Sequence, residues 1–170
     1  STETVEQVTR FKKLVFPEDP PASTPVAKRP AELVLHYHAV PARAFDNLCY
    51  SPTYTHDAHQ LMHQTRYPSM TITHHYWVPL MLLGWGADPL NSMITGWCSW
   101  DTWVTVNDPK IVITIMADLP NMNLKPLQGP STHLGVPDGW AMDTFTRLQR
   151  FYGAAAHRGD GVVIIAELRE

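Results

Sequence analysis

Residues 31–40 read AELVLHYHAV, and this stretch indicates the fold of the chain more clearly than any other. Its side chains alternate in a way that is typical of a β-strand with two different faces. Leu35 and Tyr37 lie on the face that we expect to join the core, which places His36 and His38 on the opposite face. The stretch therefore predicts a sheet that carries two histidines on one side.

Two helices and a second strand are expected next. Residues 41–50 and about 53–66 are predicted helices because apolar residues recur at helical spacing. Residues 70–78 alternate as a strand. If Met70 and Ile72 are on its core face, His75 and Trp77 join the histidines of the first strand.

A β-hairpin is predicted in the second half of the chain. Residues 92–106 are rich in β-branched and aromatic residues, and residues 110–117 alternate as a strand after the turn signal at 107–109. Residues 119–140 contain several prolines and glycines, which is typical of a long loop that could act as a lid.

A helix and a buried strand are predicted at the end of the chain. Asp143 caps a helix with Phe145 and Leu148 on one face, and Gly159 ends it. Residues 161–168 form a continuous apolar run, as in a covered strand. This order of elements predicts an α+β domain with a split βαβ, ferredoxin-like antiparallel sheet and helices on one face. A β-sandwich or jelly roll is the alternative.

The first thirty residues are expected to stand apart from this domain. An amphipathic helix is predicted near residues 2–15, followed by a proline-rich arm up to residue 30. Residues 31–170 then form a single globular domain. Arms of this kind reach over neighbouring subunits, so we expect a homo-oligomer that exchanges its N-terminal arms.

Composition restricts the class of protein. Hydrophobic residues make up 44% and charged residues 17% of the chain, and the net charge is −3, as in a globular protein. Lysine and arginine are dispersed, so no nucleic-acid partner is expected. No apolar run is long enough to span a bilayer, and we expect no membrane partner. With only two cysteines, the chain is expected to be cytoplasmic.

Histidine is the most informative residue type, because seven of the nine histidines fall within residues 36–75. Imidazole serves both acid–base chemistry and metal binding. Strand alternation places Val104 and Val106 on the core face, and so brings Asp101 and tryptophans to the histidine side. A carboxylate beside an imidazole is typical of a general base, and indole rings suit an apolar substrate. The predicted catalytic residues are His36, His38, His75 and Asp101, and the predicted substrate-binding residues are Tyr37, Trp77, Trp97 and Trp103.

The leading functional hypothesis is a small enzyme that uses histidine acid–base chemistry, without a cofactor, on an apolar or aromatic small molecule. Its reaction would be of the isomerase, cyclase, dehydratase or decarboxylase type. One alternative is a structural subunit such as a viral coat protein, suggested by the proline-rich arm. Another is a metal enzyme, suggested by the His-x-His pair. His56, His59 and His63 are interpreted as the solvated face of a helix.

Overall fold

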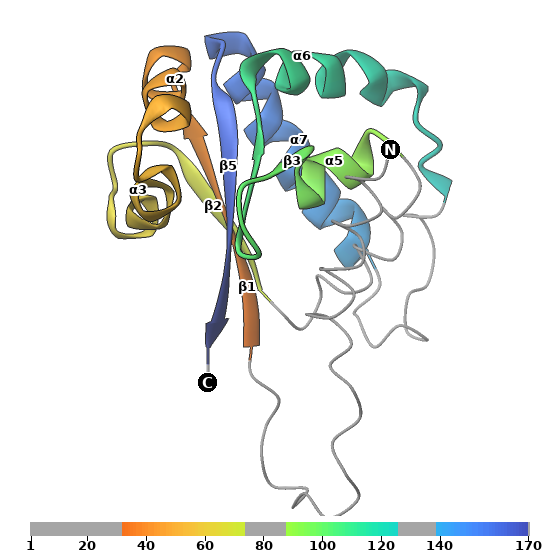
Figure 1. Cartoon of the computed structure of the whole chain (residues 1–170). Coiled ribbons are helices and arrows are strands. Elements are labelled where there is room, and N and C mark those ends of the chain that lie inside the picture. Colours follow the sequence, from red (N-terminus) through yellow and green to blue (C-terminus); the bar gives the residue numbers. More distant parts are fainter. Residues whose placement is uncertain (1–31, 74–87, 126–138, 170) are drawn as a thin grey trace, which may run out of the picture.

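A five-stranded antiparallel sheet lies at the centre of the described structure (Figure 1). The computed structural model describes residues 32–73, 88–125 and 139–169. Within these residues the strand order is β2-β1-β5-β4-β3. The strands are β1 (Glu32–Val40), β2 (Ser69–Thr73), β3 (Cys98–Ser99), β4 (Val104–Asn107) and β5 (Gly161–Arg169).

The two long central strands, β1 and β5, form the frame of the sheet. They pair over their full length, from Glu32 opposite Arg169 to Val40 opposite Gly161. Residues 161–166 of β5 are buried on both faces of the sheet, which explains why the sequence shows a continuous apolar run there. The predicted strands at 31–40 and 161–168 are therefore confirmed.

Helices cover both faces of this sheet (Figure 1). The α7 face carries Leu35, Tyr37 and Ile164, which pack with α5 (Leu90–Thr95), α6 (Pro109–Asp118) and α7 (Trp140–Arg158). The α2 face carries Val104, Val163 and Ile165. These residues form a second core cluster with α2 (Ala42–Tyr50), α3 (Tyr54–Gln60) and the short 3₁₀ helix η1 (Leu61–His63). A further 3₁₀ turn, η2 (Leu119–Asn121), follows α6.

The short helix α5 is buried along its whole length, so its terminal carbonyl groups need donors from elsewhere in the protein. The hydroxyl of Tyr37 donates to the carbonyl of Ile94 at 2.9 Å. The hydroxyl of Tyr152 donates to the carbonyl of Met93 at 2.6 Å. Burial raises the pKa of both tyrosines well above the usual value, so both hydroxyls keep the proton that they donate.

Asn107 completes this set of hydrogen bonds. Its side-chain amide donates to the carbonyl of Ser92 at 2.8 Å and to the hydroxyl of Tyr152 at 3.0 Å. Its side-chain oxygen accepts from the backbone N–H of Trp97 at 2.8 Å. Residues from β1, β4 and α7 thus converge on one helix end, and they tie the α7 face of the sheet to the helices above it.

The predicted hairpin, which joins residues 92–106 to residues 110–117, is wrong: residues 92–95 belong to the helix α5, and the second run is also helical. Residues 109–118 form α6, and Asp108 caps this helix by accepting a hydrogen bond from the backbone N–H of Ile111 at 2.8 Å. An Asp-Pro pair can open a helix as well as form a turn. Val112 and Ile115 are buried one turn apart, and this helical spacing prevails over the alternation of isoleucines. The hairpin in this region is instead β3 with β4.

The predicted fold class is confirmed at the level of an α+β protein with an antiparallel sheet. The finer assignment differs, because a split βαβ unit separates its two helix-linked strands by another strand. Here β1 and β2, which α2 and α3 connect, are direct antiparallel neighbours. The helices also cover two faces instead of one, and the described residues form one sheet, not a β-sandwich or jelly roll.

Two of the predicted helices and part of the second predicted strand are present in the described residues. The helices predicted after Pro41 and before Gly159 are present as α2 and α7, and the second strand is present up to Thr73. The N-terminal helix and arm, the rest of the second strand, and the middle of the predicted loop lie outside the described residues. No helix in the described ranges is long and apolar enough to cross a membrane.

The hydrogen bonds at the end of α5 give a first prediction. Substituting Tyr152→Phe removes the donor to Met93 and the acceptor for Asn107, leaving buried polar groups unpaired. We expect the free energy of unfolding in urea to fall by about 1–3 kcal/mol. Tyr50→Phe is the matched control, because Tyr50 is 87% exposed, and it should change little. Equal stability of both variants and the wild type would contradict this role of Tyr152.

The start of α6 gives a second prediction. Asp108→Ala removes the helix cap and should lower the free energy of unfolding by about 1 kcal/mol. Asp118→Ala makes the same chemical change in the last turn of the same helix, where a carboxylate is unfavourable. Chemical denaturation should therefore show a loss for the first variant only. A similar loss in both would mean that Asp108 acts through overall charge and not as a cap.

Candidate functional site

The closest contact between a histidine and a carboxylate in the described structure joins His36 to Glu167. Nε2 of His36 lies 2.6 Å from Oε2 of Glu167. His36 pairs with Ile165 across β1 and β5, and Glu167 is two residues further along β5 on the same face. Diagonal neighbours of this kind are within reach of each other across a sheet. The pair therefore lies on the α2 face.

The electrostatics of this pair determine which nitrogen of the imidazole is available. The hydrogen bond from His36 lowers the pKa of Glu167, which keeps the carboxyl group ionised at neutral pH. An ionised carboxylate only accepts hydrogen bonds, so Nε2 of His36 must carry the proton that the two atoms share. Neutral His36 then keeps its lone pair on Nδ1, which is the atom that can take up a proton.

His38 lies on the same face, two residues further along β1. It is 4% exposed, and its Nε2 atom is buried without a hydrogen-bond partner among the described residues. Burial, together with the nearby charge of His36, lowers the pKa of His38 to about 4. His38 is therefore a neutral imidazole at physiological pH. It differs from His36, which is less deeply buried and is hydrogen-bonded to Glu167.

The tryptophans predicted to share this face do not gather there. Tyr37 lies on the core face, as strand alternation predicts, but it is fully buried in the core of the α7 face and exposes no surface for the predicted contact with a substrate. Trp103 packs against that same core, and Trp97 is about half exposed beside β3. The reason is the strand register: Val104 pairs with Ile165, so Val104 and Val106 belong to the α2 face and not to the face of Leu35. His75 and Trp77 lie outside the described residues.

Asp101 has a different role from the predicted one. Its Oδ1 atom accepts the backbone N–H groups of Trp103 and Val104, both at 2.7 Å, and so fixes the turn between β3 and β4. Its Oδ2 atom lies 3.4 Å from Nε2 of His59 on α3. Among the described residues, Asp101 therefore pairs with His59 and not with His36 or His38.

The three histidines predicted to form a solvated helix face lie on α3 and η1. His56 and His63 are exposed, as expected for a solvated helix face, whereas His59 is partly covered beside Asp101. Nowhere in the described ranges are three or more histidine, cysteine, aspartate or glutamate side chains grouped as metal ligands would be.

Sequence reasoning missed Glu167 and Trp100. Glu167 is a charged residue in an otherwise apolar strand, and strand alternation places it on the same face as Val163 and Ile165. This charge was the signal from which its role could have been inferred. Trp100 is the indole that packs against the α2-face cluster. Its ring meets that of Tyr54 edge-on, with the centroids 5.4 Å apart. No alternation could have placed Trp100, because it lies in the turn between β3 and β4.

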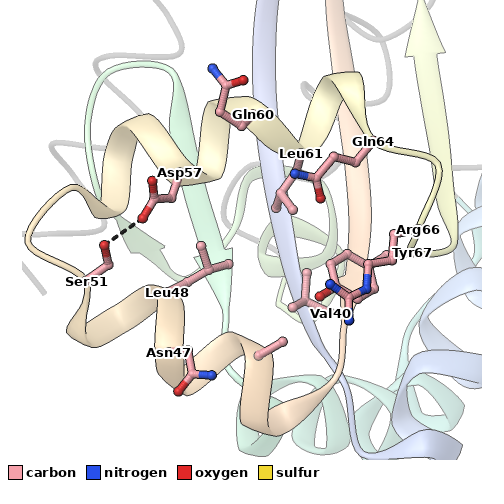
Figure 2. Close-up of a pocket in the computed structure, with 11 residues that line it drawn as sticks. Val40, Asn47, Leu48, Ser51, Asp57, Gln60, Leu61, Gln64, Arg66 and Tyr67 are labelled. Carbon is pink, nitrogen blue, oxygen red and sulfur yellow. Dashed lines mark hydrogen bonds between the residues drawn. The ribbon is translucent and has the colours of Figure 1, made fainter.

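A cleft of about 550 Å³ opens on the α2 face between α2 on one side and α3 with η1 on the other (Figure 2). Val40, Leu48 and Leu61 contribute apolar surface to it. Val40 is four residues from His36 along β1, a separation of about 13 Å in an extended strand. The cleft and the pair formed by His36 and Glu167 are thus separate features of one face.

Comparison with known proteins supports the fold. No protein-family model matches the chain, and a search of curated proteins gave no match. The crystal structure of YfbM from Escherichia coli, a protein of unknown function, is similar with a TM-score of 0.56 and 15% sequence identity. The similarity covers 79% of this chain and 99% of that one. At this identity it shows a shared fold alone, so the protein has a YfbM-like α+β fold.

The buried imidazole of His38 makes a prediction about pH. Its folded pKa of about 4 lies below the ordinary value of 6.5, so between these values the unfolded chain binds a proton that the folded protein does not. The free energy of unfolding should therefore fall as the pH is lowered from about 6.5 to about 4, and this contribution should level off below that.

Denaturation curves of His38→Leu, recorded across this pH range, test the effect. Glu167 also loses stabilising interactions in acid, so the difference between wild type and variant isolates His38. The variant should show a shallower fall in stability with acid. His63→Leu, at an exposed position, should keep the slope of the wild type. If His38→Leu keeps it too, His38 does not have the low pKa described.

Proposed function

We propose that this protein is a small enzyme that uses His36 as a general acid–base group, held in position by Glu167. Its substrate would be an apolar or aromatic small molecule, and its reaction of the isomerase, cyclase, dehydratase or decarboxylase type. The observation that carries the proposal is the 2.6 Å hydrogen bond between Nε2 of His36 and Oε2 of Glu167. A carboxylate that fixes the tautomer of an imidazole is a recurrent arrangement in acid–base catalysis.

The proposed chemistry depends on the unprotonated Nδ1 atom of His36. Nδ1 of His36 accepts a proton from a C–H or O–H group of the substrate, and the resulting imidazolium is stabilised by the adjacent carboxylate of Glu167. The imidazolium then returns the proton to a different substrate atom, which restores the neutral base. The side chain of His36 is 13% exposed, so it is shielded from bulk water but still reachable.

Two other features of the α2 face support the proposed site. His38 stays neutral beside His36, so it adds no positive charge to oppose formation of the imidazolium. Trp100 adds an indole ring to the α2 face, in keeping with an apolar or aromatic substrate. Glu167 takes the role that the sequence analysis gave to Asp101.

A generic proton-abstraction substrate tests the proposal without knowledge of the natural one. In 5-nitrobenzisoxazole, a base removes the ring C–H proton, the N–O bond breaks, and the coloured 2-cyano-4-nitrophenolate forms. We expect the protein to accelerate this reaction above an equal concentration of free imidazole. His36→Gln, which keeps a polar side chain beside Glu167, should lower kcat/KM at least about tenfold.

The matched control is His63→Gln, which makes the same change at an exposed histidine on the same side of the sheet and should keep the wild-type rate. Circular dichroism of each variant establishes that it is folded. A wild-type rate no higher than that of free imidazole, or full activity of folded His36→Gln, would exclude His36 as the base.

Glu167 acts through His36, so its variants should affect catalysis and not binding. We expect Glu167→Gln to lower kcat with 5-nitrobenzisoxazole about tenfold or more while KM stays close to that of the wild type. Glu167→Asp keeps the charge on a shorter side chain and should recover part of the loss. A change confined to KM, or no recovery by aspartate, would show that Glu167 does not position the base.

A further inference from the structure

We propose that the cleft between α2 and α3 binds a small carboxylic acid with an apolar body, at a site separate from His36 and Glu167. The volume of about 550 Å³ lies within the range of about 300–1,000 Å³ that is usual for small-molecule sites. The polar and apolar residues that line this cleft are distributed unevenly, and this distribution indicates both the class of ligand and its orientation (Figure 2).

The floor of the cleft is apolar. Val40 at the end of β1, Ala44 and Leu48 on α2, and Leu61 on η1 all line it. Leu61 and Val40 belong to the buried cluster of the α2 face, so this floor is part of the rigid core. A hydrocarbon chain or ring laid against it gains the free energy of removing apolar surface from water. The body of the ligand is therefore apolar.

Arg66 supplies a cationic anchor at one end of the cleft. Its guanidinium lies over the ring of Tyr67, with the carbon atom 5.5 Å from the ring centroid. Among the described residues, no carboxylate forms an ion pair with Arg66. A guanidinium presents a planar fork of donors that matches a carboxylate, and stacking on an aromatic ring limits its motion.

The opposite end of the cleft is acidic, which sets the orientation of the ligand. Figure 2 shows Asp57 and Ser51 at one end, away from Arg66 and Tyr67. The hydroxyl of Ser51 donates to Asp57 at 2.6 Å, and that of Thr53 donates to it at 3.2 Å, so this carboxylate is held in place by the chain itself. A carboxylate ligand is repelled from Asp57 and attracted by Arg66.

Three side-chain amides are also among the residues that line the cleft. Asn47 on α2, Gln60 at the end of α3 and Gln64 after η1 each offer donors and an acceptor. These groups can complete the hydrogen bonds of a carboxylate or of a hydroxyl on the ligand. They also provide signals by which binding can be observed directly.

The experiment uses the full chain labelled with ¹⁵N, and 4-methylpentanoate and 4-methylpentanamide as probes. The two probes share one apolar body and differ in charge. We expect saturable shifts of the Gln60 and Gln64 side-chain amide signals with the acid, and at least about tenfold weaker binding of the amide. Arg66→Gln should weaken binding of the acid about tenfold or more. Arg43→Gln should not, because Arg43 is an exposed arginine of α2 that does not line the cleft.

Each other outcome overturns the proposal. Absence of saturable shifts with the acid excludes this class of ligand, and equal affinity for the acid and the amide excludes an anionic one. Unchanged binding to folded Arg66→Gln, or equal losses in both arginine variants, excludes Arg66 as the anchor. The result is independent of the proton-transfer test, because His36→Gln should bind the acid like the wild type.

Discussion

The burial of α5 is the constraint on which the rest of the structure depends. A six-residue helix with every residue buried cannot satisfy its last carbonyl groups from water. Tyr37, Tyr152 and Asn107 supply the donors, one from β1, one from α7 and one from β4. These elements must therefore meet at one point. That requirement holds the α7 face of the sheet closed, and both proposed sites lie on the opposite face.

The α2 face combines a rigid sheet with a less complete covering. The central strands β1 and β5 are fully paired, so His36 and Glu167 are held by the most extensively hydrogen-bonded part of the sheet. A site built on paired strands keeps its geometry better than one built on loops. The short helices α2 and α3 cover only part of the face, and a cleft lies between them. The two proposed sites thus share one face but differ in chemistry.

The sequence predicted those parts of the fold in which local pattern and tertiary environment agree. The long strands, α2 and α7 have clear periodicity, and the structure confirms them, but α7 begins at Trp140, so Asp143 lies inside the helix and does not cap it. The prediction failed at α6, where an alternating run of isoleucines concealed the helical spacing of Val112 and Ile115. The sequence did not show which carboxylate lies beside which histidine, because that depends on the register between strands that are distant in the chain. Alternation within one strand correctly placed His36 and His38 on the same face of the sheet. To place Trp103 on a face, the pairing of Val104 with Ile165 was also needed, and the sequence does not show that pairing.

The central claim is that Glu167 fixes the tautomer of His36 and leaves Nδ1 free to take up a proton. The most direct measurement is the ¹⁵N spectrum of the His36 side chain in the full protein, recorded at a pH at which the imidazole is neutral. We expect the shifts of a protonated Nε2 and an unprotonated Nδ1, with Glu167→Gln weakening that preference. A neutral His36 with its proton on Nδ1 would contradict the claim, because Nε2 could not then donate to Glu167.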